Sequence, residues 1–136
     1  MRILKPVGVE IEFDDKQRHL LFNVNVIDII QEHYGMYIVD VLNSIFTEEK
    51  DKQAKAYDIV SYVLSVLVND EVERHNEENP NDIWKEVPEK YLRRFILHNT
   101  NTAIVGHLIL QSFNESLPQE QNEDEDPNQT SGQTIN

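Results

Sequence analysis

The first part of the chain alternates between apolar and polar residues, and this pattern predicts a β-hairpin. Residues 7–13 place an apolar side chain at every second position, with Glu10 and Glu12 among the residues between them, which is the period of a half-buried strand. A polar turn at residues 14–17 leads to a second short strand at residues 18–22. Two strands alone are marginally stable in water, so we expect the hairpin to pack on helices and to turn both glutamates toward solvent.

Beyond the hairpin, apolar residues recur at intervals of three and four, which is the spacing of an amphipathic helix. The clearest stripe is broad enough for a central helix and consists of Ala56, Ile59, Val60, Val63, Leu64 and Leu67. Helices are expected at approximately residues 26–34, 38–45, 54–68, 88–97 and 102–116. The predicted fold is therefore mainly α, with an N-terminal β-hairpin packed on a bundle of about five helices.

Residues with special backbone preferences set the expected helix boundaries. Asn25 is a good N-cap for the first helix, and Gly35 is placed as the left-handed residue that ends it. Pro80 disfavours helix at the residue before it, so the polar segment 70–81 should leave the helical conformation near His75.

The apolar spacing also predicts the burial of two side chains in the last two helices. Tyr91 accompanies Leu92 and Ile96 on the face that we expect to point inward. His107 lies between apolar positions, which predicts that it is partly buried.

Acidic residues outnumber basic ones, and the excess falls in two parts of the chain. The formal net charge is −13, from 12 Lys and Arg against 25 Asp and Glu. Residues 117–136 carry five of these acids and no base, which predicts a disordered acidic tail after a single domain at residues 1–116. The domain retains a charge of −8 (12 basic minus 20 acidic residues). Such a surface repels phosphates and anionic lipid, so we expect neither a nucleic-acid nor a membrane partner.

No combination of residues predicts a catalytic or cofactor site. The chain has no cysteine, and its four glycines do not have the spacing of a phosphate-binding loop. No two histidines lie three or four positions apart, as a two-histidine metal site on a helix requires. His75, which has carboxylates on both sides, is the best candidate ligand, but a solvated, charged helix end is the better interpretation. We therefore expect no enzyme activity, no metal and no cofactor.

Five residues are candidates for contact with a protein partner because they lie beside breaks in the helical pattern. Tyr34 and Tyr37 flank the glycine that ends the first helix. Ile83, Trp84 and Val87 lie between two prolines, in a segment that need not belong to the core. No apolar run is long enough for a signal peptide or a membrane-spanning helix, which favours the cytosol.

The order and polarity of these elements resemble the tail assembly chaperones of long-tailed bacteriophages, particularly those of phages and prophages of Gram-positive hosts. The resemblance covers residues 7–118. It is carried by the hairpin at 9–22, the segment 25–35, the helix 56–68 with the polar residues 69–75, and the helix 101–116 followed by Leu117, Pro118 and a polar tail. The family often has small residues near the end of the central helix, where this chain has Leu67, Val68 and Asn69.

The resemblance implies a function that works through surfaces. Tail assembly chaperones are thought to coat the tape-measure protein, keep it soluble and help to recruit tail-tube subunits. The partners implied are therefore the tape-measure protein and the tail-tube protein, with self-association possible for a protein that coats a long helix. The implied location is the host cytoplasm and not the mature virion.

Two other classes of protein stay open from the residues alone. An acidic inhibitor of host defence, of the anti-restriction or anti-CRISPR type, would mimic DNA and needs carboxylates on one rigid face. Five of the acids lie in the predicted tail, which disfavours this class. A helical adaptor protein is the other alternative.

Overall fold

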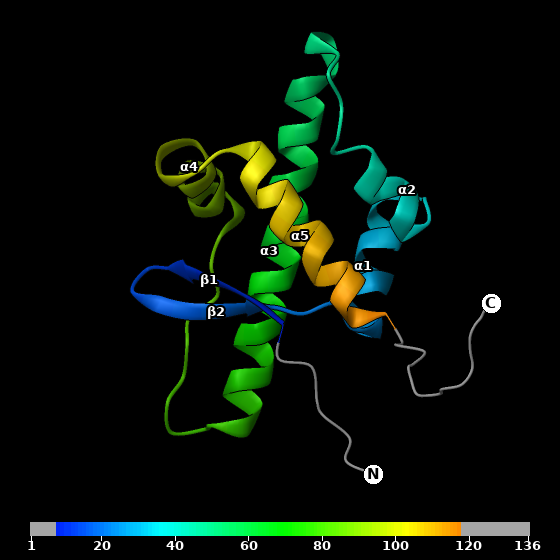
Figure 1. Ribbon diagram of the computed structural model, residues 1–136. Helices are drawn as coiled ribbons and strands as arrows, with labels where there is room; N and C mark the ends of the chain where they lie inside the picture. Colours follow the sequence, from blue (N-terminus) through cyan, green and yellow to red (C-terminus); the bar gives the residue numbers. More distant parts are fainter. Residues whose placement is uncertain (1–7, 118–136) are drawn as a thin grey trace, which may run out of the picture.

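One long helix, α3 (Gln53–Glu78), runs through the middle of the structure, and the other elements pack around it (Figure 1). The computed structural model describes residues 8–117. In chain order the other elements are β1 (Val9–Phe13), β2 (Lys16–Leu20), α1 (Val24–Tyr34), α2 (Ile38–Asn43), the short 3-10 helix η1 (Lys50–Lys52), α4 (Glu89–Asn99) and α5 (Thr102–Ser116). The predicted fold is confirmed for the described residues: an N-terminal hairpin packs on five α-helices. The predicted acidic tail lies, apart from Leu117, outside the described residues.

The hairpin turns through only two residues, Asp14 and Asp15, and not through the four that the sequence suggested. Both have positive φ, 58° and 59° respectively, as a type I′ turn requires, and aspartate tolerates this region better than most residues. The resulting register places Arg18 opposite Ile11 and therefore on the inward face. The two glutamates of β1 are exposed, as predicted.

The cap of helix α1 lies two residues earlier than expected, and the helix ends where the sequence predicted. The side-chain oxygen of Asn23, not of Asn25, accepts the hydrogen bond that caps the helix, from the backbone N–H of Val26 at 2.8 Å. Asn23 also donates to Asp70 on α3 at 2.9 Å, a shorter contact than the 3.3 Å between Asn25 and the same carboxylate. Gly35 has φ 64° and ψ 32°, the left-handed conformation that glycine adopts at lowest cost.

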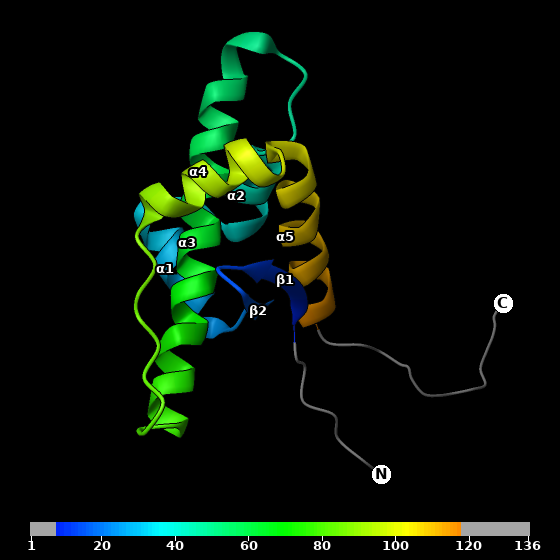
Figure 2. The same ribbon diagram turned by 90° about the vertical axis from the view of Figure 1, so that its left-hand side faces the viewer.

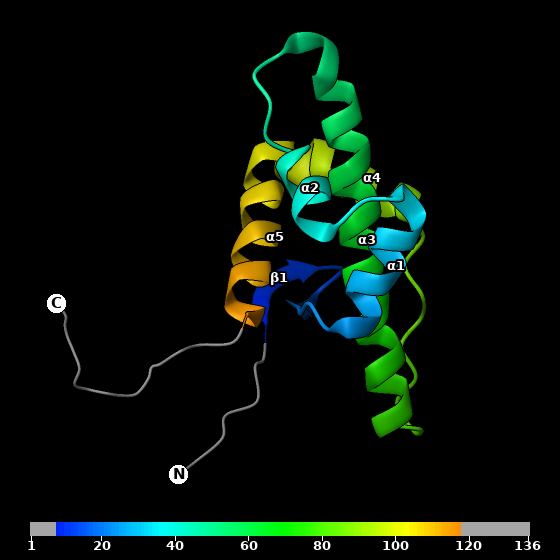
Figure 3. The same ribbon diagram turned by 90° about the vertical axis from the view of Figure 1, so that its right-hand side faces the viewer.

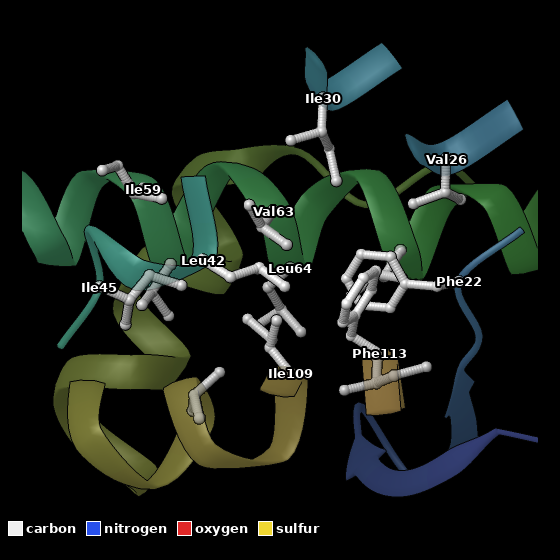
Figure 4. Packing of buried hydrophobic residues seen from close by; sticks show 14 of the residues in the cluster. Phe22, Val26, Ile30, Leu42, Ile45, Ile59, Val63, Leu64, Ile109 and Phe113 are labelled. Atoms are coloured by element: carbon white, nitrogen blue, oxygen red, sulfur yellow. The ribbon is translucent and has the colours of Figure 1, made fainter. Parts of the chain in front are cut away.

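The core forms where the apolar stripe of α3 meets α1, α2 and α5 (Figure 4). Side views place α5 on one side of α3 and α1 on the other, with the hairpin beneath α4 (Figures 2 and 3). The whole predicted stripe is buried, with exposed fractions of 4% or less: Ala56, Ile59, Val60, Val63, Leu64 and Leu67. Burial of this stripe on three sides makes α3 the central helix that the sequence predicted.

The polar residues after the apolar stripe do not end α3. The helix continues to Glu78, and Asp70 and Glu71 are only 7% and 8% exposed. The expected departure from helix near His75 is therefore wrong, although the helix ends before Pro80 as that residue requires. The reason is tertiary, because carboxylates in this segment are paired with side chains far away in the sequence.

Two predicted side-chain positions are also wrong. Tyr91 is 48% exposed, since the inward stripe of α4 is narrow and only Leu92 and Ile96 are fully buried on it. His107 is exposed and lies against the ring of Phe46, with 5.1 Å between ring centroids.

Candidate partner-binding site

An extended segment, residues 83–88, runs back along the C-terminal half of α3 and is called the strap below (Figure 1). Two asparagine side chains of α3 hold it by paired hydrogen bonds. The Asn69 amide donates to Val87 O at 2.9 Å, and its oxygen accepts from Val87 N at 2.7 Å. The Asn76 amide donates to Trp84 O at 3.0 Å and accepts from Trp84 N at 2.7 Å.

The spacing of the two asparagines matches that of the backbone they hold. Seven helical residues from Asn69 to Asn76 rise by about 10.5 Å, and three extended residues from Trp84 to Val87 cover about 10 Å. Both side chains therefore reach the strap without distorting the helix. Each asparagine satisfies a backbone N–H and a backbone C=O that have no strand partner, so the strap is fixed as firmly as a short strand pair.

Near the N-terminal end of the strap, the ring of Trp84 packs against one histidine and two basic side chains. His75 stacks on it with 3.8 Å between ring centroids and an interplanar angle of 14°. Arg18 and Lys16 of the hairpin lie over the ring at 5.5 Å and 5.6 Å from its centroid. The Nε2–H of His75 donates to Asp82 O at 2.8 Å.

His75, the best metal ligand among the histidines by sequence, thus packs on an aromatic ring. Within residues 8–117, no three histidine, aspartate or glutamate side chains are arranged to hold a metal ion.

Two buried carboxylates of α3 join the hairpin and α1 to the long helix. Glu71 accepts from the backbone N–H of His19 at 2.9 Å and lies 2.8 Å from Nδ1 of the same residue. Asp70 accepts from three side chains, Asn23 at 2.9 Å, Asn25 at 3.3 Å and Arg74 at 3.0 Å. Apart from the bond of Arg74, which lies within α3, these bonds join residues that are 45 to 52 positions apart, so they fix the walls around the C-terminal half of α3.

An open groove of about 490 Å³ lies between α1, α3 and the strap, and it is called the α1–α3 groove below. Ile29 of α1, Val66 of α3 and Trp84 of the strap supply apolar surface. Glu73 and Glu86, both exposed, lie among its lining residues. The groove thus combines an apolar part, called its floor below, with carboxylates and with other polar lining residues, namely Asn25, Ser65, Asn69, Asp70 and Asn76.

The five candidate residues from the sequence fall into two groups. On the strap, Ile83 is 63% exposed, Trp84 is half-buried, and Val87 is buried at 7%. Beside Gly35, Tyr37 is 78% exposed and Tyr34 is half-buried.

The structure does not bring the two groups together. Tyr34 packs on Tyr62 with 5.6 Å between ring centroids, whereas Trp84 packs beside Asn76. The two positions on α3 are fourteen residues apart, or about 21 Å along the helix. Of the five candidates, only Trp84 of the strap lines the groove.

Titration of Tyr34 gives a direct measure of its burial. Burial raises the pKa of Tyr34 to about 12, and Tyr62, Glu89 and Asp58 act in the same direction. An unfolded tyrosine titrates near pH 10, so the folded state holds this proton to higher pH. Its contribution to stability is complete below about pH 10 and is lost as the pH rises toward about 12. Burial also raises the pKa of Tyr62. We therefore expect an absorbance titration of phenolate to show a late component that Tyr34→Phe reduces and that the exposed control Tyr37→Phe leaves in place.

The sequence did not single out the residues that build the groove walls. Asn69 and Asn76 lie seven positions apart on one face of α3, and that spacing is the only signal they leave in the sequence. Arg18 lies at an inward position of the second strand by the alternation from Leu20, which is a signal that could have been used.

Comparison with models of protein families, with curated proteins and with solved structures finds no match for this chain. Among residues 8–117, no helix combines the length and the apolar character that crossing a bilayer would require.

Proposed function

We propose that this chain is a tail assembly chaperone of a long-tailed bacteriophage or prophage of a Gram-positive host. In this role it binds the tape-measure protein, keeps it soluble until the tail is built, and helps to recruit tail-tube subunits. The proposal starts from the resemblance in the order and polarity of the hairpin and helices. The observation that carries it furthest is the α1–α3 groove, an open, partly apolar surface on a fixed helical frame.

The surface as a whole suits a chaperone for a long helical protein. Large apolar side chains are exposed on several elements. They are Val24, Ile29, Met36, Tyr37, Val39, Phe46, Ile83, Tyr91, Leu97, Ile104 and Leu117. A partner helix gains stability by covering such anchors, and the net negative charge of the complex opposes its aggregation.

The geometry of the groove favours a protein partner over mimicry of DNA. A DNA mimic presents carboxylates in place of phosphates and has no use for an apolar floor between them. In the α1–α3 groove, the apolar side chains Ile29, Val66 and Trp84 line the same surface as acidic side chains. Removal of apolar surface from water is the main driving force of protein association, so this arrangement supports binding to a protein.

The test is co-expression with the tape-measure protein encoded in the same genome. The tape-measure protein should aggregate when expressed alone, and with this chain it should enter the soluble fraction and co-purify. Addition of the tail-tube protein should then give a ternary complex on size exclusion. A tape-measure protein that remains insoluble and unbound at equal expression of this chain would contradict the proposal.

A further inference from the structure

We infer that the α1–α3 groove binds one amphipathic helix whose apolar edge is flanked by lysine and arginine. The inference rests on the proposed function in one respect, namely that the helix belongs to the tape-measure protein.

The dimensions of the groove fit a short stretch of helix. Its lining residues on α3 run from Ser65 to Asn76, eleven positions or about 16 Å, which is the length of three helical turns. Ile29 is 38% exposed, and Val66 and Trp84 are half-buried, so the floor has apolar area left to cover. A helix that presents apolar residues at i, i+3, i+4 and i+7 places two or three of them on this floor.

The charges around the floor select the flanks of that helix. Glu32 lies one turn from Ile29 on α1, and Glu77 follows Glu73 by one turn of α3. With the lining residues Glu73 and Glu86, four exposed carboxylates therefore lie in the groove or one turn from its lining.

The basic groups nearby do not balance these carboxylates. Lys85 of the strap is exposed, and Lys16 of the hairpin lies 5.6 Å from the ring centroid of Trp84. Arg74 is already bound to Asp70 at 3.0 Å, so the four exposed carboxylates outnumber the two remaining lysines. The carboxylates on both walls repel a partner helix with acidic flanks, and they attract a partner helix whose flanks carry lysine or arginine.

The groove keeps its shape without the partner. Its strap wall is fixed by Asn69 and Asn76, and its α1 wall is tied to α3 through Asp70. A preformed site loses little conformational entropy on binding, so a single short helix suffices as occupant.

Two synthetic helical peptides of about 18 residues, long enough to form helix when bound, provide the probes. Both carry the same leucine stripe, and the flanking positions are lysine and arginine in one and glutamate in the other. Fluorescence anisotropy with the full chain should show binding of the basic peptide, weakened as salt is raised, and much weaker binding of the acidic peptide.

Charge reversal locates the binding site. The double variant Glu73→Lys, Glu86→Lys should weaken the basic peptide by about tenfold, because each surface pair contributes up to about 1 kcal/mol and reversal adds repulsion. The matched control is Glu12→Lys, Glu48→Lys, which changes the net charge equally at exposed positions on the hairpin and on the loop before η1. The inference is overturned if both double variants weaken binding equally, or if the two peptides bind the parent chain equally well.

The same variants separate this inference from the proposed function. One outcome of co-expression is that the tape-measure protein stays soluble with the control but aggregates with the groove variant. This result supports both the groove assignment and the chaperone function. If the groove variant solubilises it as well as the control does, the groove assignment fails and the chaperone function stands. If the basic peptide binds the groove but the tape-measure protein stays insoluble with the parent chain, the function fails and the groove assignment stands.

Discussion

Replacement of Asn69 by alanine should lower the free energy of unfolding by about 2–4 kcal/mol, because it leaves buried backbone groups without partners. Val87 is 7% exposed, and its N–H and C=O both bond to the Asn69 amide. Helix propensity alone predicts the opposite sign, since alanine is the better helix former. Urea unfolding followed by circular dichroism measures the difference. Asn114→Ala, at an exposed position of α5, is the matched control and should be neutral or slightly stabilising.

The second asparagine of the strap should have a smaller effect. Trp84 is half-buried, so water replaces part of the hydrogen bonding that Asn76→Ala removes from its backbone. We therefore expect the free energy of unfolding to fall by about 1–2 kcal/mol. The double variant should lose less free energy of unfolding than the two single variants lose together. The reason is that freeing one end of the strap already loosens the other end. Trp84 is the only tryptophan, and its emission should shift to the red in each variant. Stability and emission in Asn69→Ala that match Asn114→Ala would show that the strap is held by other contacts.

Replacement of Arg18 should give opposite results for methionine and alanine. Arg18 is 2% exposed, with its guanidinium 5.7 Å from the Phe13 ring centroid and 5.5 Å from that of Trp84. Its Nε and Nη1 make no hydrogen bond within the described residues. Burial lowers the pKa of Arg18, although the negative charges of Glu71 and Asp14 oppose this. Desolvation of a guanidinium costs several kcal/mol, which the two rings and the two carboxylates offset only in part.

We therefore expect Arg18→Met to be as stable as the parent chain or more stable by about 1 kcal/mol, since the side chain fills the same space without unpaired donors. Arg18→Ala opens a cavity between the two rings and should lose about 2–4 kcal/mol. Thermal unfolding compares the two, with Arg94→Met at an exposed position of α4 as the control. If Arg18→Met loses as much stability as Arg18→Ala, the charge of Arg18, and not the volume that its side chain fills, holds the hairpin on α3.

Short-range patterns in the sequence predicted most of the fold. The alternation in residues 7–13 and the helical stripe of α3 reflect burial on one face, and burial of a periodic face is decided within each element. Gly35 ends α1 as predicted because the left-handed conformation depends only on the local backbone. Asn23 and Asn25 show the limit of such reasoning, since both are good caps and both donate to Asp70 in the structure. Only the structure shows that the cap is Asn23, which accepts from the backbone N–H of Val26.

The candidate site was predictable only in part. A segment between two prolines with Ile83 and Trp84 indicated an element outside the helical bundle, and this segment is the strap. Its attachment was not predictable, because the amides of Asn69 and Asn76 are polar helix residues like any others until their partners are known.

By itself, the sequence determined the hairpin, the helices, the central stripe and the excess of acid, because each follows from periodicity or composition. Only the tertiary structure decided that Asp70 and Glu71 are buried, that Arg18 faces inward between two rings, and that α1 and the strap enclose a groove. The physical reason is that a polar side chain is stable in the interior only with a partner. For Glu71 that partner is His19, 52 residues away, and local sequence carries no record of the pairing.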